Sequence, residues 1–293
     1  MKRIETLIED IYEVVRNNGW YSEDISRGFV RELDQRLIEN VNSKPKIPSL
    51  RLSQMGKKCP CQLWHSIHSS SLQEPLPPWA RIKYTYGHIL EAYVISMAKA
   101  AGHEVLGEQD ELRLDGIVGH RDCVIDGNIV DVKSTSSIGF QKFKDGSIRS
   151  SDNFGYLDQL DGYVLASRDD DLVRNKESGF LLAIDKTLGK ICLYEHHVRE
   201  ESIRKRVTDY RAIVALDRPP VCTCEEVPDG SSGNYRLGTT ASYSSFKYCC
   251  HPGLRTFLYA EGPRYLTKVV RRPVRRDGTP IPEVDRHGKI VYN

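Results

Sequence analysis

The stretch of sequence that decides the fold runs from Gly119 to Lys133 and reads Gly-His-Arg-Asp-Cys-Val-Ile-Asp-Gly-Asn-Ile-Val-Asp-Val-Lys. Two short runs rich in β-branched residues are separated by Asp126-Gly-Asn, which predicts a β-hairpin. Side chains two positions apart in a strand share a face, so Asp131 and Lys133 should project together. Asp122 can reach the same place from the neighbouring strand.

The carboxylates and the ammonium group of this hairpin suit metal-dependent chemistry on a phosphodiester. Carboxylate oxygens are the ligands that Mg²⁺ and Mn²⁺ prefer, and these ions keep bound waters for contact with a substrate. A bound metal ion acidifies water and polarises a phosphodiester, and Lys133 can position that water or stabilise developing charge. The alternative is a solvated hairpin with a surface ion pair, because an acid two residues before a Lys occurs by chance in many proteins.

The segments on either side of the hairpin place further polar residues around it. A helix is expected over about residues 79–101, and it carries Glu91. A second helix, over about 154–167, carries Gln159 and Tyr163, which lie four apart and hence on one face. Strand-like runs and a charged helix follow, which together predict an α/β fold with a mixed central sheet of about five strands, flanked by helices.

The two ends of the chain are expected to differ from this middle part. Residues 1–42 are expected to be helical with a break at Asn17-Asn18-Gly19, and residues 60–69 form another expected helix. After Pro219-Pro220 the chain is rich in Gly, Ser and Pro, and we expect irregular structure there. Four aromatic residues at helical spacings are expected in the core more often than against nucleic-acid bases: Trp64, Trp79, Tyr84 and Tyr86.

The order of these motifs resembles that of the PD-(D/E)XK nuclease superfamily, specifically its RecB- and AddB-like branch, which includes phage exonucleases and CRISPR adaptation nucleases. The shared pattern is a helix with Gly-x-x-x-Glu, then Gly-His-x-Asp, then Asp/Glu-x-Lys, then Gln-x-x-x-Tyr. This chain matches the pattern at Gly87 and Glu91, Gly119, His120 and Asp122, Asp131 and Lys133, and Gln159 and Tyr163. The resemblance implies a restriction-endonuclease-like core over about residues 50–260.

The resemblance also implies a role for each residue of the pattern. The residues implied to bind Mg²⁺ or Mn²⁺ are Glu91, Asp122, Asp131 and Val132, the last through its carbonyl group. Lys133 would orient the attacking water, while Gln159 and Tyr163 would shape the site and touch the DNA backbone. Many members of the family have a metal-binding His directly before the helix Glu, where this chain has Leu90. His88 is the nearby candidate for that ligand.

The function implied by the resemblance is metal-dependent hydrolysis of DNA, as an exonuclease of phage or bacterial recombination or repair. Two alternatives stay open. One is an endonuclease of the structure-specific or CRISPR-adaptation type, and the other is a non-catalytic DNA-binding partner subunit that keeps the fold. The implied partners are DNA that is single-stranded or has free ends, and a recombinase or helicase protein.

Six of the eight cysteines lie in three close pairs, which in a reducing compartment indicates a metal or cluster site rather than disulfides. Several members of the family join the two flanks of the nuclease core with a [4Fe–4S] cluster. By this resemblance the ligands are Cys59, Cys222, Cys224 and Cys250, with Cys61 and Cys249 as alternates. Tetrahedral zinc is the rival occupant, and the spacing of the cysteines does not decide between them.

Composition and charge set the remaining limits. The chain has 293 residues and a formal net charge of +2, and it holds no stretch near the ~20 apolar residues that a membrane helix needs. It shows no secretory signal pattern, so we expect it in the cytoplasm of a bacterium or a phage-infected host. Residues 264–293 carry eight Lys and Arg against three acidic residues, which indicates either a polyanion partner or a solvated tail. We expect a helical arm (1–50), a nuclease domain closed by the cysteine site (51–262) and a basic tail (263–293).

Overall fold

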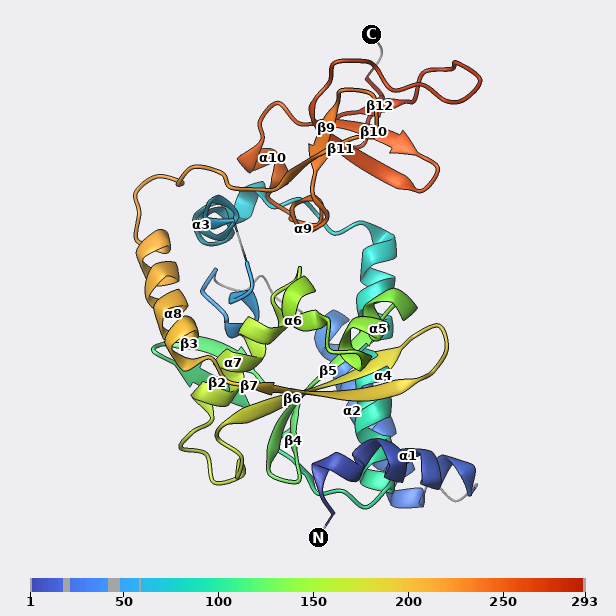
Figure 1. Cartoon of the computed structure of the whole chain (residues 1–293), viewed down its shortest axis with the longest axis vertical. Coiled ribbons are helices and arrows are strands. Elements are labelled where there is room, and N and C mark those ends of the chain that lie inside the picture. Colours follow the sequence, from blue (N-terminus) through green and yellow to red (C-terminus); the bar gives the residue numbers. More distant parts are fainter. Residues whose placement is uncertain (1, 18–21, 42–47, 58, 292–293) are drawn as a thin grey trace. The chain divides into compact units, whose positions relative to one another are not determined.

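The computed structural model describes residues 2–17, 22–41, 48–57 and 59–291, apart from the side chains of residues 39–41. The chain divides into two compact units (Figure 1). Unit 1 comprises Met1–Gly56 and Pro77–Val207, and unit 2 comprises Lys57–Leu76 and Thr208–Asn293. These units are built from interleaved segments of the chain.

Unit 1 is built around a five-stranded mixed sheet with the strand order β1-β4-β5-β6-β7 (Figure 1). Its strands are β1 (Val105–Leu106), β4 (Cys123–Ile125), β5 (Asn128–Thr135), β6 (Ser178–Asp185) and β7 (Ile191–His197). Strands β5 and β6 are parallel, and the other neighbouring pairs are antiparallel. A separate hairpin consists of β2 (Glu111–Leu114) and β3 (Ile117–His120).

Helices cover both faces of this sheet, which confirms the predicted α/β fold. On one face, α1 (Leu7–Arg16) and α4 (Pro78–Ala100) pack against alternate strand residues that include Val130 and Val132. On the other face lie α5 (Ser137–Lys144) and α7 (Tyr156–Ala166). Because side chains alternate along a strand, Asp131 and Lys133 of β5 project from this second face.

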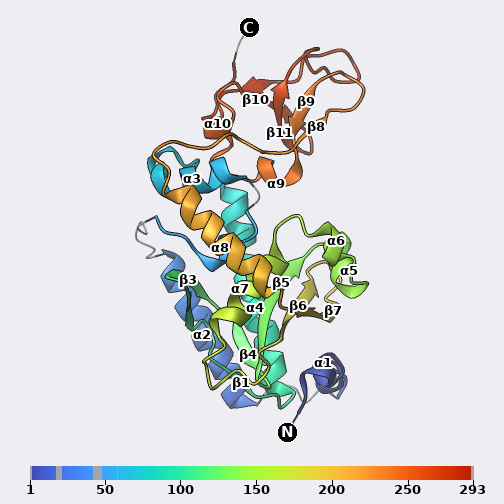
Figure 2. The same ribbon diagram turned by 60° about the vertical axis from the view of Figure 1, so that its left-hand side comes forward.

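The remaining helices of unit 1 include the second half of the expected N-terminal arm. Helix α2 (Glu23–Val41) runs alongside α4 (Figure 2), and the rings of Phe29 and Tyr93 meet edge to face with their centroids 6.1 Å apart. The expected break at Asn17-Asn18-Gly19 begins where α1 ends, since Asn17 is the C-cap of α1, and residues 18–21 lie outside the described residues. The other elements are η1 (Ile4–Thr6), η2 (Leu52–Gln54), α6 (Ile148–Ser151) and α8 (Glu200–Val214), within which the division between the units falls.

The predicted hairpin is present as β4 and β5. Ile125 pairs with Asn128 across a two-residue turn, in which Asp126 and Gly127 have φ values of 49° and 77°. Positive φ at both central positions is the geometry that Asp-Gly favours in tight hairpins, since its twist matches that of the strands. This turn fixes the register of Cys123 opposite Val130, and hence of the residues that follow.

Unit 2 contains a five-stranded antiparallel sheet with the order β12-β10-β11-β9-β8. Its strands are β8 (Glu226–Pro228), β9 (Tyr235–Leu237), β10 (Arg255–Tyr259), β11 (Gly262–Lys268) and β12 (Glu283–Val284). Its helices are α3 (Pro60–His68), η3 (Ser70–Leu72), α9 (Thr239–Ser242) and α10 (Lys247–Cys250). The expectation of irregular structure after Pro220 is therefore wrong. Most of these strands are too short for an alternating sequence pattern to indicate them. The expected basic tail includes β11 and β12.

The expectation that the aromatic residues of α4 lie in the core is also wrong. The exposed fractions of Trp79, Tyr84 and Tyr86 are 54%, 59% and 42%. The continuously buried part of α4 begins only at Val94, so the first half of the helix contributes little to the core. None of the described helices combines the length and the apolarity needed to cross a membrane.

Candidate functional site

The β4–β5 hairpin places two of the predicted carboxylates side by side. Cys123 pairs with Val130, so the register continued by one residue sets Asp122 opposite Asp131. Strand β4 begins only at Cys123, so the backbone of β5 after Val130 has no partner from β4 and can bind a side chain instead. There the backbone N–H of Val132 donates a hydrogen bond of 2.7 Å to Asp122 Oδ2. This contact fixes the Asp122 carboxylate beside β5, just before β4 begins.

Lys133 is held beside Asp131 as a fixed cation. Its Nζ lies 2.6 Å from Asp131 Oδ2, and the two side chains are 17% and 2% exposed. Burial works against the charged ammonium, but the Asp131 and Asp122 carboxylates outweigh it and hold the pKa of Lys133 above its ordinary value. The Nζ also lies 4.9 Å from the centroid of the Tyr156 ring. Lys133 therefore stays protonated throughout the physiological range of pH.

Helix α7 supplies Gln159 and Tyr163 to the same place. Gln159 Nε2 donates to Asp131 Oδ1 at 3.3 Å and to the Tyr163 hydroxyl at 2.7 Å. Gln159 Oε1 accepts a hydrogen bond of 3.4 Å from Lys133 Nζ. Burial, followed by the nearby charge of Asp131, raises the pKa of Tyr163 and keeps its hydroxyl protonated. The two residues act together because they lie one helical turn apart.

Glu91 reaches the site from α4. Its Oε1 accepts hydrogen bonds from Arg36 Nη1 at 2.6 Å and from Gln109 Nε2 at 3.0 Å. The other predicted residue of this helix, His88, lies one turn earlier. Its Nδ1 is 3.9 Å from Glu91 Oε2, and its side chain is half-exposed. His88 is therefore next to Glu91 but makes no hydrogen bond to it.

The three carboxylates affect one another electrostatically. Burial, followed by the negative charges of Glu91 and Asp131, raises the pKa of Asp122 well above its ordinary value. Such crowding of negative charge is relieved by a divalent cation, and a donor set made only of oxygens suits Mg²⁺ or Mn²⁺. Among the described residues, the cysteines of unit 2 are the one set of three or more ligand atoms that all lie within 4.8 Å, so the carboxylates are spaced more widely. That spacing still fits Mg²⁺, which is commonly bound by one or two carboxylates and several waters.

Gly119 of the predicted motif has a packing role. A Cβ atom at this position would lie 2.8 Å from Leu52 Cβ and 3.0 Å from Tyr163 Cε1. Real Cβ atoms do not approach so closely, so any larger residue would displace Tyr163 or η2. The absence of a side chain at Gly119 thus allows β3 to lie directly beside the ring of Tyr163.

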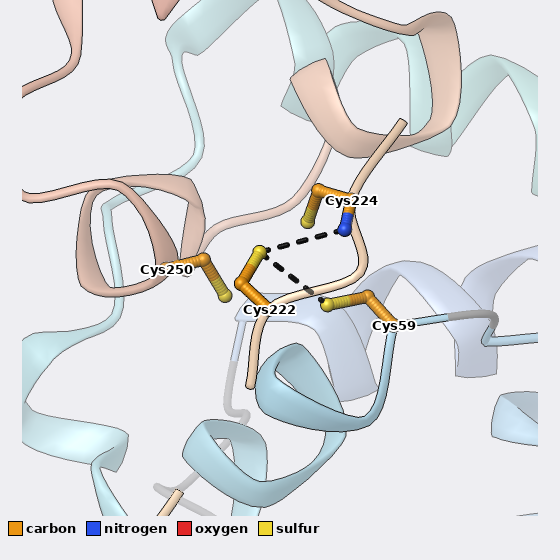
Figure 3. Close-up of side chains that lie close together, drawn as sticks. All are labelled: Cys59, Cys222, Cys224 and Cys250. Atoms are coloured by element: carbon orange, nitrogen blue, oxygen red, sulfur yellow. Dashed lines mark hydrogen bonds between the residues drawn. The ribbon is translucent and has the colours of Figure 1, made fainter. Parts of the chain in front are cut away.

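The second site lies in unit 2 and consists of the four cysteines selected from the sequence. The Sγ atoms of Cys59, Cys222, Cys224 and Cys250 all lie within 4.8 Å of one another, and the side chains point toward a common centre (Figure 3). Cys59 directly precedes α3, and Cys250 ends α10. The Sγ atoms of Cys59 and Cys222 are 3.8 Å apart. Four thiol groups this close can share one tetrahedral metal ion.

Neighbouring polar groups surround these sulfurs. The backbone N–H of Cys224 lies 3.4 Å from Cys222 Sγ, and Gln62 Nε2 donates to Cys224 Sγ at 2.9 Å. His251 Nε2 lies 3.4 Å from Cys222 Sγ. The two alternate ligands, Cys61 and Cys249, both lie outside the group of four. Cys61 Sγ nevertheless contacts Cys250 Sγ at 3.2 Å. Hydrogen bonds of this kind orient the side chains of metal ligands.

No protein-family model matches the chain, and no curated protein matches it in sequence. Similar solved structures include SSO0001, with 16% sequence identity, 77% of this chain and 96% of that chain covered, and a TM-score of 0.42. An alkaline exonuclease from Laribacter hongkongensis in complex with dAMP has 12% identity, coverages of 58% and 87%, and a TM-score of 0.41. A phage-related exonuclease from Haemophilus somnus 129PT has 15% identity, coverages of 60% and 96%, and a TM-score of 0.39. These values are too low to identify a family.

Three residues of the unit 1 site were not expected from the sequence. Tyr156 precedes Gln159 by three positions and shares its helix face, so the helical period could have indicated it. Gln109 lies in a turn with a φ of 58°, and nothing in its surroundings marks it as a partner of Glu91. Arg36 contacts Glu91 across 55 residues of chain. A contact of this kind depends on how α2 packs against α4, which local sequence patterns do not encode.

Proposed function

We propose that this protein is a divalent-metal-dependent nuclease that hydrolyses phosphodiester bonds of DNA. The observation that carries the proposal is the meeting of Asp122, Asp131 and Lys133 where β4 begins beside β5, with Glu91 brought in from α4. A set of buried oxygen donors beside a permanently charged ammonium matches the needs of phosphodiester hydrolysis, in which negative charge grows on the phosphate.

The residues of the site divide the work between them. The residues that would hold Mg²⁺ or Mn²⁺ are Glu91, Asp122, Asp131 and the carbonyl group of Val132. The bound ion would supply Lewis acidity and lower the pKa of a water molecule. Lys133 can then hold the oxygen of the attacking water or stabilise the charge that develops on the phosphate. Gln159 orients Asp131 and Lys133 at once, because its amide contacts both side chains.

Within this activity we propose an exonuclease, the mode that the motif resemblance implies for DNA with free ends. An endonuclease would use the same residues, so only the products distinguish the two. A non-catalytic DNA-binding subunit is disfavoured, because such a protein would be expected to lose the set of two Asp and one Lys, and this chain has all three.

A time course on end-labelled linear DNA and on circular single-stranded DNA tests the proposal. With Mg²⁺ or Mn²⁺, we expect degradation of the linear substrate from an end, no cleavage of the circle, and no activity in EDTA. Cleavage of the circle would replace the exonuclease with an endonuclease. Purified, folded protein that cleaves neither substrate with either ion would overturn the assignment as a nuclease.

For the cysteine site we propose a single tetrahedral ion, with zinc as the occupant. Zinc–sulfur bonds of about 2.3 Å in a tetrahedron set the sulfurs about 3.8 Å apart. The Sγ atoms of Cys59 and Cys222 are 3.8 Å apart, and no pair in the group exceeds 4.8 Å. A [4Fe–4S] cluster places a cube of iron and sulfide between its cysteines and therefore holds them farther apart than one ion does. The sulfurs fit the single ion better.

Metal analysis of protein purified without oxygen or chelators decides between these occupants. We expect one zinc per chain and a colourless preparation. Four irons with acid-labile sulfide, and a brown colour, would overturn the single-ion proposal and restore the cluster. A protein with no metal would leave the four cysteines as free thiols and overturn both.

A further inference from the structure

Arg36 of α2 is buried beside the carboxylates of unit 1, although no sequence motif includes it. Its Nη1 donates to Glu91 Oε1 at 2.6 Å, and its Nε donates to Glu32 Oε1 at 2.7 Å. The side chain is only 9% exposed. Its third nitrogen, Nη2, is buried and has no hydrogen-bond partner among the described residues. Two nitrogens of the guanidinium are thus held in place, while the N–H groups of the third make no hydrogen bond to the described residues.

A buried hydrogen-bond donor without a partner destabilises the folded protein, so its presence here calls for an explanation. Nη1 is bound to Glu91, whose negative charge contributes to the raised pKa of Asp122. The unpartnered nitrogen therefore belongs to a side chain of the carboxylate site rather than of a remote packing contact. A planar guanidinium clamped at two positions presents its remaining N–H groups in a fixed direction, which suits the oxygens of a phosphate group.

We propose that Arg36 is a phosphate-binding residue of this site, which donates from Nη2 to a non-bridging oxygen of the phosphodiester being cleaved. This inference rests on the proposed nuclease function and extends it to the N-terminal helices. Glu32 and Glu91 act as the positioning residues of the guanidinium. Lys133 pairs with Asp131 and Arg36 pairs with Glu91, so Arg36 gives the site a second fixed positive charge.

A purely structural role, as an ion pair that ties α2 to α4, is the competing explanation. The two roles differ in what they require of the side chain. An ion pair with Glu91 can be kept by Lys, which carries the same charge on a flexible stem. Simultaneous contact with Glu32, Glu91 and a phosphate oxygen needs the planar fork of Arg, so Lys should preserve the helix contact and lose the phosphate contact.

The chain offers a matched control on the same helix. Arg27 pairs with Glu23 four residues earlier, as Arg36 pairs with Glu32, but its side chain is 68% exposed. The experiment compares the wild type with Arg36→Lys, Arg36→Met and Arg27→Met. It measures the melting temperature, the single-turnover cleavage rate with Mg²⁺, and the affinity for a fluorescein-labelled single-stranded oligonucleotide with Ca²⁺ in place of Mg²⁺.

We expect Arg36→Lys to melt close to the wild type and yet to cleave ~10²-fold more slowly, since one contact to developing charge is lost. Its affinity for the oligonucleotide should fall about tenfold, and Arg27→Met should match the wild type in every measurement. If Arg36→Lys cleaves and binds like the wild type, the phosphate role is wrong and the ion pair is structural. Arg36→Met serves as the full truncation, and its folded fraction should show losses at least as large.

The design separates this inference from the function on which it rests. If the wild type binds the oligonucleotide but does not cleave it, the nuclease proposal fails, and the binding arm alone decides on Arg36. If the wild type cleaves and Arg36→Lys does too, only the Arg36 inference fails. If the wild type neither binds nor cleaves, both are overturned.

Discussion

The two candidate sites of this protein are built in opposite ways. In unit 1, Asp131 and Lys133 project from β5, the middle strand of a five-stranded sheet. Asp122 directly precedes β4, and Glu91 lies on α4, which packs on one face of the sheet. The four cysteines of unit 2 come from short segments: the residue before α3, a stretch without regular structure before β8, and the four-residue helix α10.

The cores of the two units differ in the same sense. The buried cluster of unit 1 joins α1, α4 and four strands of the sheet, whereas two small clusters in unit 2 each contain three buried residues. Unit 1 can thus form its site from packing alone. In unit 2 a bound ion would supply free energy of folding that the small clusters do not. The comparison suggests that packing within unit 1 positions the carboxylate site, whereas an ion bound by the four cysteines would stabilise the fold of unit 2.

Loss of the metal ion proposed for unit 2 should have the largest effect. We expect Cys224→Ser, or a strong chelator, to unfold unit 2 at a much lower temperature, because binding of a structural ion is worth several kcal/mol of folding free energy. Unit 1 should melt as before, so calorimetry should show the two transitions move apart.

Cys192→Ser provides the control for this prediction, because Cys192 is a free cysteine of β7 outside the group of four. It should leave both transitions in place. A Cys224→Ser variant that melts like the wild type and yet loses all cleavage would contradict the structural role and indicate a catalytic or redox-sensing one.

The second effect concerns unit 1, where the charged side chains should matter for activity and little for stability. Asp131→Ala removes a metal ligand and Lys133→Ala removes fixed positive charge, and each should reduce cleavage by ~10²–10³-fold. Circular dichroism and thermal melting should show an intact fold. The exposed Asp34 of α2 offers a matched control, and Asp34→Ala should cleave normally. Either site variant cleaving at the wild-type rate would show that the site is wrongly assigned.

A third prediction tests whether the backbone of unit 1 is as tightly determined as the comparison requires. Gly155, directly before α7, has a φ of 73°, and a Cβ there would lie 2.0 Å from Gly56 Cα. Gly155→Ala should cost about 1–3 kcal/mol of unfolding free energy and reduce cleavage, since α7 carries Gln159.

Gly116→Ala separates crowding from backbone strain in this experiment. Gly116 has a similar φ of 81°, but a Cβ there meets nothing within 4 Å. Its loss of stability should be about 1 kcal/mol, from the positive φ alone. Equal losses for the two variants would show that the contact between Gly56 and Gly155 imposes no constraint.

The smallest effect is expected from an ion pair in the unit 2 sheet. Arg255 Nε and Nη2 contact the two carboxylate oxygens of Glu283 at 2.7 and 2.6 Å. This pairing lowers the pKa of Glu283, so its stabilising contribution is present above the unfolded pKa and is lost as the pH falls through the folded one. Glu283→Gln should therefore destabilise unit 2 by about 1 kcal/mol at neutral pH. The difference from the wild type should shrink in acid, and a constant difference would exclude this origin.

What the sequence could predict follows from the distance over which each feature is encoded. The hairpin turn at Asp126-Gly127, and the shared face of Asp131 and Lys133, depend on residues within a few positions of one another, and both are present in the structure. The approach of the four cysteine sulfurs could be expected only because a family resemblance supplied the pairing of distant segments.

Features that depend on tertiary packing were missed. The contact of Arg36 with Glu91 joins two helices whose own patterns are ordinary. The exposure of Trp79 was not predicted, because a helical period shows which residues share a face and not whether that face is covered. The strands of unit 2 are short and lie among glycines and prolines, so neither period could reveal them.

The interleaved chain path has a consequence for the order of events during synthesis. Cys59 and α3 leave the ribosome before the whole of Pro77–Val207, yet their partners in unit 2 lie in Thr208–Asn293. Domains fold as units as the chain emerges, so unit 1 can be complete before the other three cysteines of the group reach Cys59. Once Val207 has left the ribosome, the emerged chain thus already contains the carboxylate site, while Cys222, Cys224 and Cys250 are still to follow. A premature stop before Cys250 should yield a folded unit 1 that carries a disordered remnant, which is a ready substrate for proteases.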